Sequence, residues 1–206
     1  MDMKDNNHPK KERTLVIIKP DGIQRSLMGE IIGRYERVGL KLVAIKMMVP
    51  TVELVEKHYT LDPEWLRLAG DKSIKNGKEK GHPVLSEEPI EVGKMVLKSL
   101  VKYLTSGPVV AMIWEGSHAV EIVRKIVGST EPLSSDVGTI RGDHVIDSYQ
   151  VSNQDGRAIR NLVHASGSVK EAHDEITHWF SEKEIIKYTH AQERILYDVN
   201  LDGILE

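Results

Sequence analysis

The chain has 206 residues, of which 40% are hydrophobic and 29% are charged, and its formal net charge is -3. This length supports one hydrophobic core rather than two, and the slight acidic excess argues against a dedicated nucleic-acid-binding protein. The chain contains no cysteine, which excludes disulfide bonds, thiolate metal sites and a cysteine nucleophile. The polar first residues and the lack of a long apolar run predict no signal peptide and no membrane span, so we expect a cytoplasmic protein.

The first part of the chain alternates between strand and helix patterns. Residues 14–19 are apolar and β-branched, as in a buried strand, and they end at a turn signal formed by residues 20–22. Residues 27–39 carry apolar side chains at helical spacing, and residues 41–49 are apolar on both faces, which is typical of a central strand. Residues 51–59 have the pattern of a short helix that begins at an N-cap threonine.

The middle of the chain begins with an irregular stretch. Residues 60–89 are rich in Lys, Glu, Gly and Pro without a sustained period, and we expect an insertion with one short helix around Trp65. Regular patterns then return: a helix over residues 91–104, a third buried strand over residues 109–116 and a further helix over residues 118–128.

The last part contains a second irregular stretch, residues 148–157, then a short strand over residues 162–166 and a helix over residues 168–180. Ser168 and Glu171 are spaced as a capping box at the start of that helix. The element order β-α-β-α-α-β-α-β-α predicts a ferredoxin-like βαββαβ sandwich. This is an α+β fold in which helices pack on an antiparallel four-stranded sheet.

Several residue types that often carry function are ambiguous when each is taken singly. His173 and His178 are five residues apart on a helix pattern, so their side chains diverge and do not predict a metal site. Lys19 closes a buried strand, where an ammonium is costly unless paired, although a lysine at a strand end can also reach solvent. Arg124 on a helix and Arg141 in a loop are each typical of surface charges.

His164 lies in the middle of a short apolar strand that stops at Ser-Gly-Ser. Strand alternation places Leu162, His164 and Ser166 on one face, where a core histidine is the plainer explanation. However, the strand leads directly into a helix N-terminus, whose free N–H groups favour anions such as phosphate. Glu175, two turns into that helix, is placed to hold one ring nitrogen, as carboxylates that orient a base do.

Four segments decide between these alternatives when they are read together. They are ERTLVIIKPDGIQRSLMGEII (residues 12–32), KYLTSGPVVAMIWEG (102–116), GTIRGD (138–143) and NLVHAS (161–166). Their sequence and their order closely resemble the nucleoside diphosphate kinase family. The resemblance covers nearly the whole chain apart from the N-terminal tail and the two irregular stretches.

The resemblance implies a ping-pong phosphoryl transfer that maintains the pools of nucleoside and deoxynucleoside triphosphates. A nucleoside triphosphate, typically ATP, passes its γ-phosphate to a histidine, and a nucleoside diphosphate removes it. The histidine of the family falls on His164. A neutral imidazole suits this step because it is nucleophilic near pH 7.

The resemblance also assigns the residues around the nucleotide. It implies four phosphate-binding residues: Lys19, Arg124, Thr130 and Arg141. It further implies that Asn161 and Lys19 reach the ribose, that Tyr59 lies near the transferred phosphate, and that Ser166 and Glu175 surround the histidine. Mg²⁺ would arrive bound to the nucleotide phosphates, with no protein side chain as metal ligand. The family forms hexamers or tetramers, and the loop around Pro132 resembles one that packs between subunits.

The chain departs from the family pattern in three places. We expect a polar tail over residues 1–11 and one domain over residues 12–206, with insertions near 60–95 and 148–157. The first insertion leaves Val96 where the family has an aromatic that stacks on the base, so base stacking is unassigned and broad base tolerance is expected. Trp65 is an alternative stacking partner. The second insertion lengthens the link before Asn161.

The third departure is Gly167, which replaces the aspartate of a serine-aspartate-serine sequence in the family. These departures leave two alternative functions open. One is a regulatory nucleotide-binding protein without turnover, and the other is a nucleic-acid-binding module on the same fold, which the net charge of -3 opposes.

Overall fold

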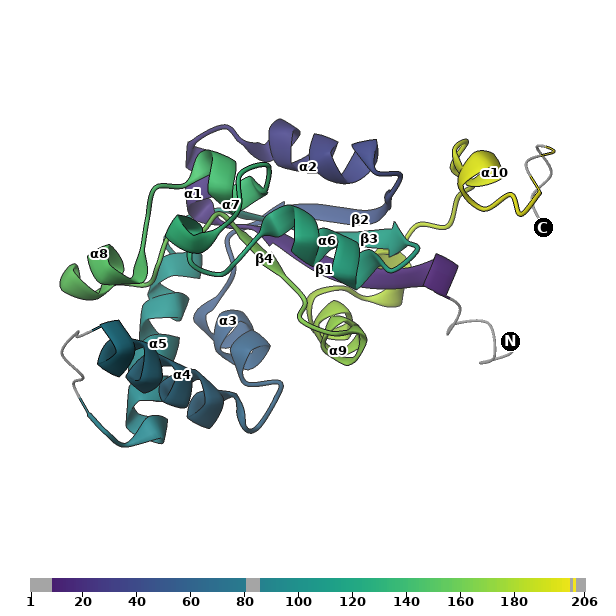
Figure 1. The fold of residues 1–206 in the computed structure, drawn as a ribbon. Helices are drawn as coiled ribbons and strands as arrows, with labels where there is room; N and C mark the ends of the chain where they lie inside the picture. The colour runs from purple at the N-terminus through teal and green to yellow at the C-terminus, as the bar shows by residue number, and fades with distance from the viewer. Residues whose placement is uncertain (1–8, 81–85, 201, 203–206) are drawn as a thin grey trace.

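The fold is built on a four-stranded sheet with the strand order β2-β3-β1-β4 (Figure 1). The strands are β1 (Glu12–Ile18), β2 (Lys41–Met48), β3 (Val109–Gly116) and β4 (Val163–Ala165), and every neighbouring pair is antiparallel. The structure, a computed structural model, describes residues 9–80, 86–200 and 202. Residues 1–8 of the expected tail and residues 81–85 of the expected insertion lie outside the described part.

Helices cover both faces of this sheet. One face carries α2 (Met28–Arg37), α6 (Ala119–Val127) and α7 (Ile140–His144), and the other carries α3 (Val52–Tyr59) and α9 (Val169–Trp179) (Figure 1). The units β1-α2-β2 and β3-α6-β4 place both crossover helices on one face. The ferredoxin-like fold predicted from the element order is therefore confirmed.

The central strand β1 is buried on both sides because its residues alternate between two cores. Val16 and Ile18 pack under α2 and α6, whereas Leu15 and Ile17 pack under α9, and all four are fully buried. Burying an aliphatic side chain of this size contributes about 1.5–3 kcal/mol. The position of β1 in the fold is therefore strongly stabilised. Lys19 is the residue directly after β1, and its position is thereby fixed.

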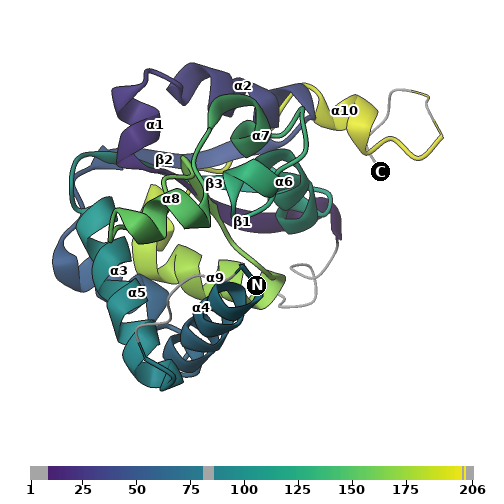
Figure 2. The same cartoon turned by 60° about the vertical axis from the view of Figure 1, so that its left-hand side comes forward.

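The remaining helices extend from one end of the sheet or lie at the termini (Figure 2). They are α1 (Pro20–Gln24), α4 (Trp65–Lys80), α5 (Pro89–Leu104), α8 (Tyr149–Gln154), α10 (Glu193–Leu196) and the 3-10 helices at Pro9–Lys11, Pro132–Ser134 and Glu182–Glu184. In the described residues no helix is both long and apolar enough to cross a bilayer.

The expectation of one short helix in the first irregular stretch is wrong, because α4 is a helix of 16 residues. It packs along α5 through two glycines. A Cβ on Gly70 would lie 1.8 Å from the carbonyl oxygen of Pro89, and one on Gly93 would lie 1.9 Å from that of Leu66. This backbone contact, rather than an apolar period within α4 itself, explains why a glycine- and lysine-rich sequence is helical here.

Three further expectations are corrected, because the structure has short helices where loops or a turn were expected. Residues 148–157 contain α8, whose N-cap Ser148 accepts a hydrogen bond from the backbone N–H of Val151. Arg141 lies on α7, which Thr139 caps in the same way, rather than in a loop. The expected turn at residues 20–22 is the first turn of α1, where proline is favoured because its missing N–H needs no partner.

Strand β2 is an edge strand and not the central strand that its apolar faces predict. Ile45 and Met47 are 51% and 58% exposed, and Val49 just beyond the strand is also exposed. An apolar edge strand with an uncovered face is a common site of association between chains. The apolar pattern therefore predicted the strand itself correctly but not its position in the sheet.

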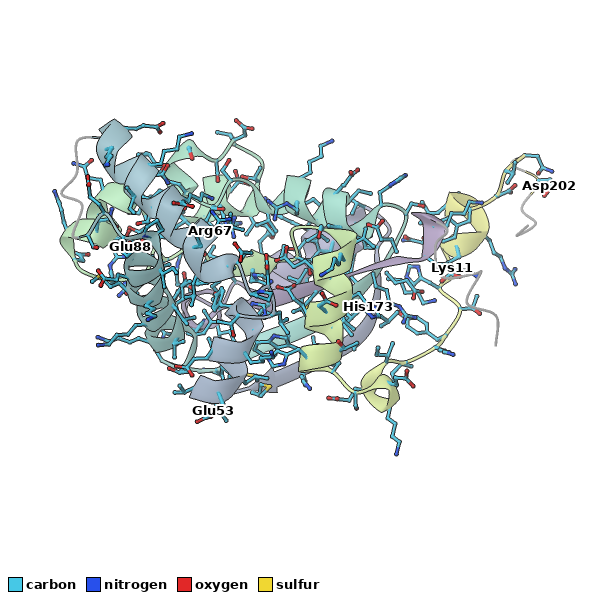
Figure 3. All side chains as sticks on the ribbon, turned by 90° about the horizontal axis from the view of Figure 1, so that it is seen from below. Lys11, Glu53, Arg67, Glu88, His173 and Asp202 are labelled. Carbon is cyan, nitrogen blue, oxygen red and sulfur yellow. The ribbon has the colours of Figure 1, made fainter. Side chains whose placement is uncertain are left out.

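Charged side chains cover the outer surface, including the outer sides of α4 and α9 (Figure 3). Arg67 on α4 pairs with Glu64 and Asp71. His173 is exposed on α9, while Nε2 of His178 lies 2.8 Å from the carbonyl oxygen of Leu54 on α3. The two histidines thus face different surroundings, as their five-residue spacing predicts.

Candidate active site

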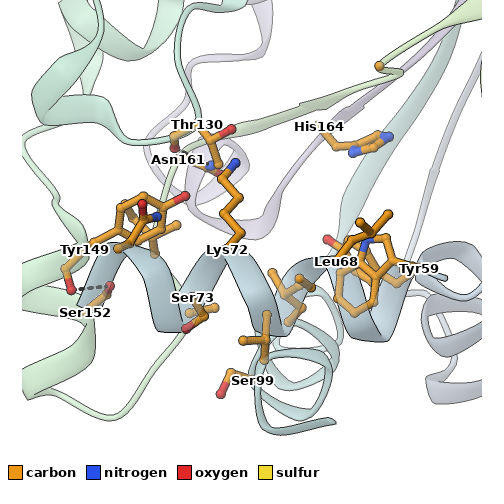
Figure 4. Close-up of a pocket in the computed structure, with 18 of the residues that line it drawn as sticks. Tyr59, Leu68, Lys72, Ser73, Ser99, Thr130, Tyr149, Ser152, Asn161 and His164 are labelled. Carbon is orange, nitrogen blue, oxygen red and sulfur yellow. Dashed lines mark hydrogen bonds between the residues drawn. The ribbon is translucent and has the colours of Figure 1, made fainter. Parts of the chain in front are cut away.

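A pocket of about 1310 Å³ opens at the end of the sheet, between α3, α4, α5, α8 and the start of α9 (Figure 4). Eight residues that the sequence analysis assigned line it: Lys19, Tyr59, Arg124, Thr130, Arg141, Asn161, His164 and Glu175. The ninth, Ser166, is fully buried and contacts Glu175. The structure therefore brings together residues that are up to 156 positions apart, from Lys19 to Glu175.

Sheet topology explains this convergence. Strand β4 pairs antiparallel with the end of β1, so that His164 lies opposite Ile17 and Val163 lies opposite Ile18. The backbone N–H of Lys19 continues this contact by donating to the carbonyl of Leu162 at 2.7 Å. The histidine and the lysine are thus neighbours because two strands are paired.

One residue beside β4 does not lie on the face that strand alternation predicts. Leu162 does not share a face with His164, because its φ of 63° turns the chain and places its side chain in the same core as Val163. A branched side chain rarely adopts this conformation, and such strain is typical of functional sites. His164 itself faces the opposite side, toward α3 and α9.

A buried chain of contacts orients the ring of His164. Its Nε2 lies 2.8 Å from Oε1 of Glu175, although the N–H is not aimed squarely at that oxygen. Oε2 of Glu175 accepts a hydrogen bond of 2.6 Å from the hydroxyl of Ser166, which in turn accepts from the backbone N–H of Leu15 at 3.2 Å. With Nε2 turned to the carboxylate, Nδ1 is the nitrogen left for chemistry.

The electrostatic surroundings keep the imidazole neutral. Burial lowers the pKa of His164, and the nearby charges of Lys19 and Arg141 lower it further. Burial also raises the pKa of Glu175. A neutral imidazole keeps a lone pair on one ring nitrogen, and the neighbouring basic groups make this part of the pocket suited to anions.

Lys19 is the most perturbed cation in the pocket. Burial, reinforced by the charge of Arg141, lowers its pKa to about 7, although Asp21 opposes the shift. Its ammonium donates to Oδ1 of Asn161 at 2.7 Å, and the amide of Asn161 donates to the carbonyl of Thr130 at 2.9 Å. This buried lysine is therefore paired rather than reaching solvent.

Arg141 has a structural task that the sequence did not reveal. Its guanidinium donates to the backbone carbonyls of Gly128, Ser129, Asn161 and Val163. Four of its five N–H groups are thereby used, which leaves one for another acceptor. Arg141 thus fastens the end of α6 to β4, and burial lowers its pKa to about 10.

His58 is a residue of this cluster that the sequence analysis missed. Its ring lies edge-on to that of His164 with 4.5 Å between centroids, and its Nδ1 accepts the indole N–H of Trp179 at 3.1 Å. Burial lowers its pKa to about 3, so it is neutral. The available signal was its spacing of three and four residues from Val55 and Leu54, which places it on the apolar face of α3.

His58, His164 and Glu175 also offer donor atoms within 4.8 Å of one another. Two imidazoles and one carboxylate suit zinc better than magnesium, which prefers oxygen ligands. However, Trp179 occupies Nδ1 of His58 and Ser166 occupies one oxygen of Glu175. We therefore assign these atoms to the orientation of the histidine and not to a metal.

The position of the absent aspartate, Gly167, is filled by another carboxylate. Oε2 of Glu171 accepts the backbone N–H of Gly167 at 3.0 Å, and a Cβ on that glycine would lie 2.5 Å from the same oxygen. The expected capping box is thereby altered: the hydroxyl of Ser168 accepts the N–H of Glu171, but the carboxylate of Glu171 binds one residue earlier than a capping box requires.

Known proteins resemble this chain in both sequence and fold. The family model described as "Nucleoside diphosphate kinase" matches residues 12–64 and 88–185. The chain belongs to the nucleoside diphosphate kinase family. The nucleoside diphosphate kinase of Pyrobaculum aerophilum is 49% identical over 180 residues, which are 85% of this chain and 98% of the relative.

Two solved structures agree with this assignment. An NDP kinase from Pyrobaculum aerophilum superimposes with a TM-score of 0.83 at 47% identity, covering 86% of this chain and all of that one. A transition-state mimic of the nucleoside-diphosphate kinase from Borrelia burgdorferi with bound vanadate and ADP gives a TM-score of 0.76 at 36% identity, covering 92% and 99%. The chain is thus a nucleoside diphosphate kinase, a phosphotransferase that acts on nucleotides.

The matched ranges bear on the two expected insertions. They leave out residues 65–87, which lie within the stretch 60–95, and they run through residues 148–157. Helix α4 therefore lies outside the family match, although it lines the same pocket as the matched residues.

Replacing Glu175 with glutamine is expected to lower kcat roughly 10- to 100-fold while the KM for the acceptor diphosphate stays nearly constant. The substitution keeps the shape of the side chain but removes the charge that holds Nε2 of His164. Steady-state exchange between ATP and a second diphosphate measures both constants. Glu182→Gln is the matched control, because Glu182 is exposed. A wild-type kcat in E175Q would mean that the carboxylate only supports packing.

Proposed function

We propose that this nucleoside diphosphate kinase transfers phosphate through Nδ1 of His164. In the first half-reaction Nδ1 attacks the γ-phosphorus of a nucleoside triphosphate, an N–P bond forms, and the diphosphate leaves with the electron pair of the broken O–P bond. In the second, a terminal oxygen of another diphosphate attacks the phosphorus and the imidazole leaves. The observation that carries this proposal is the pairing of Nε2 with Glu175, which leaves Nδ1 free beside the cations of the pocket.

The same proposal assigns roles to the neighbouring residues. Lys19, Arg124 and Thr130 bind the phosphates, and Asn161 with Lys19 binds the ribose hydroxyls. Their common location in one pocket and the 2.7 Å contact between Lys19 and Asn161 support these roles. Arg141 contributes one N–H and holds the backbone of the site. Such a set of cations stabilises the charge on a transferring phosphoryl group, which is the main requirement of this reaction.

The proposal also includes Mg²⁺, which would enter the site bound to the nucleotide and would neutralise part of the charge of its phosphates. Among the described residues the candidate cluster for a metal contains two imidazoles, which magnesium does not favour. Water and phosphate oxygens would complete its coordination, with no ligand from a protein side chain.

We further propose that the chain forms a homo-oligomer, a hexamer or a tetramer. Leu133 and Val137, in the loop around Pro132, and Ile146 are more than 70% exposed, and β2 presents Ile45 and Met47. Exposed apolar side chains of this kind on a folded protein are typical of contacts between subunits. The cytoplasmic location remains a prediction.

Labelling tests the function directly. Incubation with γ-labelled ATP and Mg²⁺ should give a phosphoprotein that is labile in acid and stable in alkali, and added GDP should discharge the label as GTP. A protein that binds ADP but neither labels nor exchanges phosphate would instead be a regulatory nucleotide-binding protein.

The pKa of Lys19 makes a prediction about proton uptake. Because that pKa is about 7 in the free protein, Lys19 is mostly neutral at pH 8. Bound phosphates raise it, so binding of ADP at pH 8 should take up close to one proton, and affinity should fall as pH rises above 7. Calorimetry in two buffers of different ionisation enthalpy measures the uptake. Lys19→Gln should bind ADP without it; equal uptake in both proteins would assign the proton elsewhere.

A further inference from the structure

Helix α4 turns one face toward the nucleotide pocket. Its lining residues include Trp65, Leu68, Lys72, Ser73 and Asn76. All the lining positions of this helix except Ile74 recur at intervals of three and four, so they form one stripe along the helix. A segment outside the family match therefore builds a wall of the site that the matched residues form.

The basic side chains of α4 are not equivalent. Arg67 pairs with Glu64 and Asp71 on the outer side of the helix, Lys75 lies near Glu79, and Lys78 pairs with Glu87. Lys72 is exposed and lines the pocket, and no hydrogen bond or ion pair joins it to another described residue. Figure 4 shows its side chain extending from α4 into the pocket, toward Thr130 and Asn161.

The position of Lys72 is fixed by two contacts in the first half of its helix. Gly70, two residues before it, lies against the backbone of α5, and a Cβ there would be 1.8 Å from the carbonyl oxygen of Pro89. The ring of Trp65 packs on that of Tyr59 with 5.2 Å between centroids. The ammonium is therefore carried by a rigid element, while its flexible stem can follow a bound ligand.

The other cations of the pocket are partly occupied. Lys19 is held by Asn161, and Arg141 has one N–H left after binding four carbonyls. A diphosphate or triphosphate brings several negative charges, and each charge that enters a pocket requires a partner. Lys72 has no ion-pair partner among the described residues and points toward Thr130 and Asn161. It can therefore pair with a phosphate charge that enters the pocket.

We propose that Lys72 binds the phosphate chain of the nucleotide, so that the α4 segment supplies a cation to the site. This inference rests on the nucleotide site proposed above and adds a residue from outside the matched ranges. Because the contact is to phosphate oxygens that all substrates share, it acts equally on purine and pyrimidine nucleotides. It also acts on diphosphates and triphosphates alike.

The test compares Lys72→Ala, Lys72→Arg and the control Lys75→Ala, which lies on the same helix outside the pocket lining. Calorimetry should show a Kd for ADP about tenfold higher in K72A, the loss typical of one charged hydrogen bond, and near wild type in K72R and K75A. The weakening should be equal for ADP, GDP and CDP, and the salt dependence of binding should be smaller in K72A.

Two outcomes would overturn the proposal. An unchanged Kd for ADP in K72A, with the wild type binding and labelling normally, would remove Lys72 from the site while the proposed function stands. A loss confined to one base would move its contact from phosphate to base. A wild type that neither binds ADP nor labels would instead overturn the proposed function, and the role of Lys72 with it.

Discussion

His164→Asn is expected to abolish phosphoenzyme formation and to lower nucleotide exchange roughly 10⁴-fold or more, the scale of removing a catalytic nucleophile. Asparagine keeps a polar group on β4 but offers no nitrogen that can attack phosphorus. The measurements are labelling by γ-labelled ATP and the rate of phosphate exchange between ATP and GDP. Binding of ADP should persist, because the proposed phosphate and ribose contacts come from other residues.

His173→Asn is the matched control, since His173 is exposed on α9 and has no place in the pocket lining. It should label and exchange as the wild type does. Label that survives in H164N would locate the nucleophile elsewhere, with His58 the nearest alternative at 4.5 Å between ring centroids. The indole N–H that occupies Nδ1 of His58 argues against that outcome.

Arg141→Lys is expected to lower the free energy of unfolding by roughly 4 kcal/mol or more, although the charge is kept. A lysine cannot reproduce the fork that binds four carbonyls on two segments, so buried acceptors lose their donors. Urea unfolding followed by circular dichroism measures this change.

Arg124→Lys is the counterpart, because the resemblance gives both arginines a phosphate contact but the structure leaves Arg124 exposed. Its free energy of unfolding should stay within about 0.5 kcal/mol of the wild type. Equal losses of stability in the two variants would mean that Arg141 has no special role in holding β4.

The sequence predicted the parts of the fold that local patterns control. The apolar residues of β1, Leu15 to Ile18, indicate a buried strand whatever the rest of the chain does. The length of α4 could not be read in this way, because its stability depends on glycine backbones meeting across two helices. The edge position of β2 could not be predicted either, since an apolar sequence looks the same in a central strand and in an edge strand that exposes Ile45 and Met47.

The residues of the site also fall into those that the sequence predicted and those that it missed. His164, Glu175 and the residues proposed to bind phosphate were predicted because the segments that contain them resemble a known family. His58 was missed because a histidine on an apolar helix face is usually only a core residue. Lys72 was missed because its segment has no counterpart in the family match, and only the packing of α4 on α5 turns it toward the pocket.

The carboxylate beside Gly167 has a consequence for how substitutions at positions 167 and 171 combine. The oxygen of Glu171 occupies the space of a side chain at position 167, so an aspartate introduced there would displace this flexible carboxylate and place a like charge beside it. Loss of Glu171 alone would leave the N–H of Gly167 without its partner. Because both changes act on the same hydrogen bond, their effects on stability should not be additive.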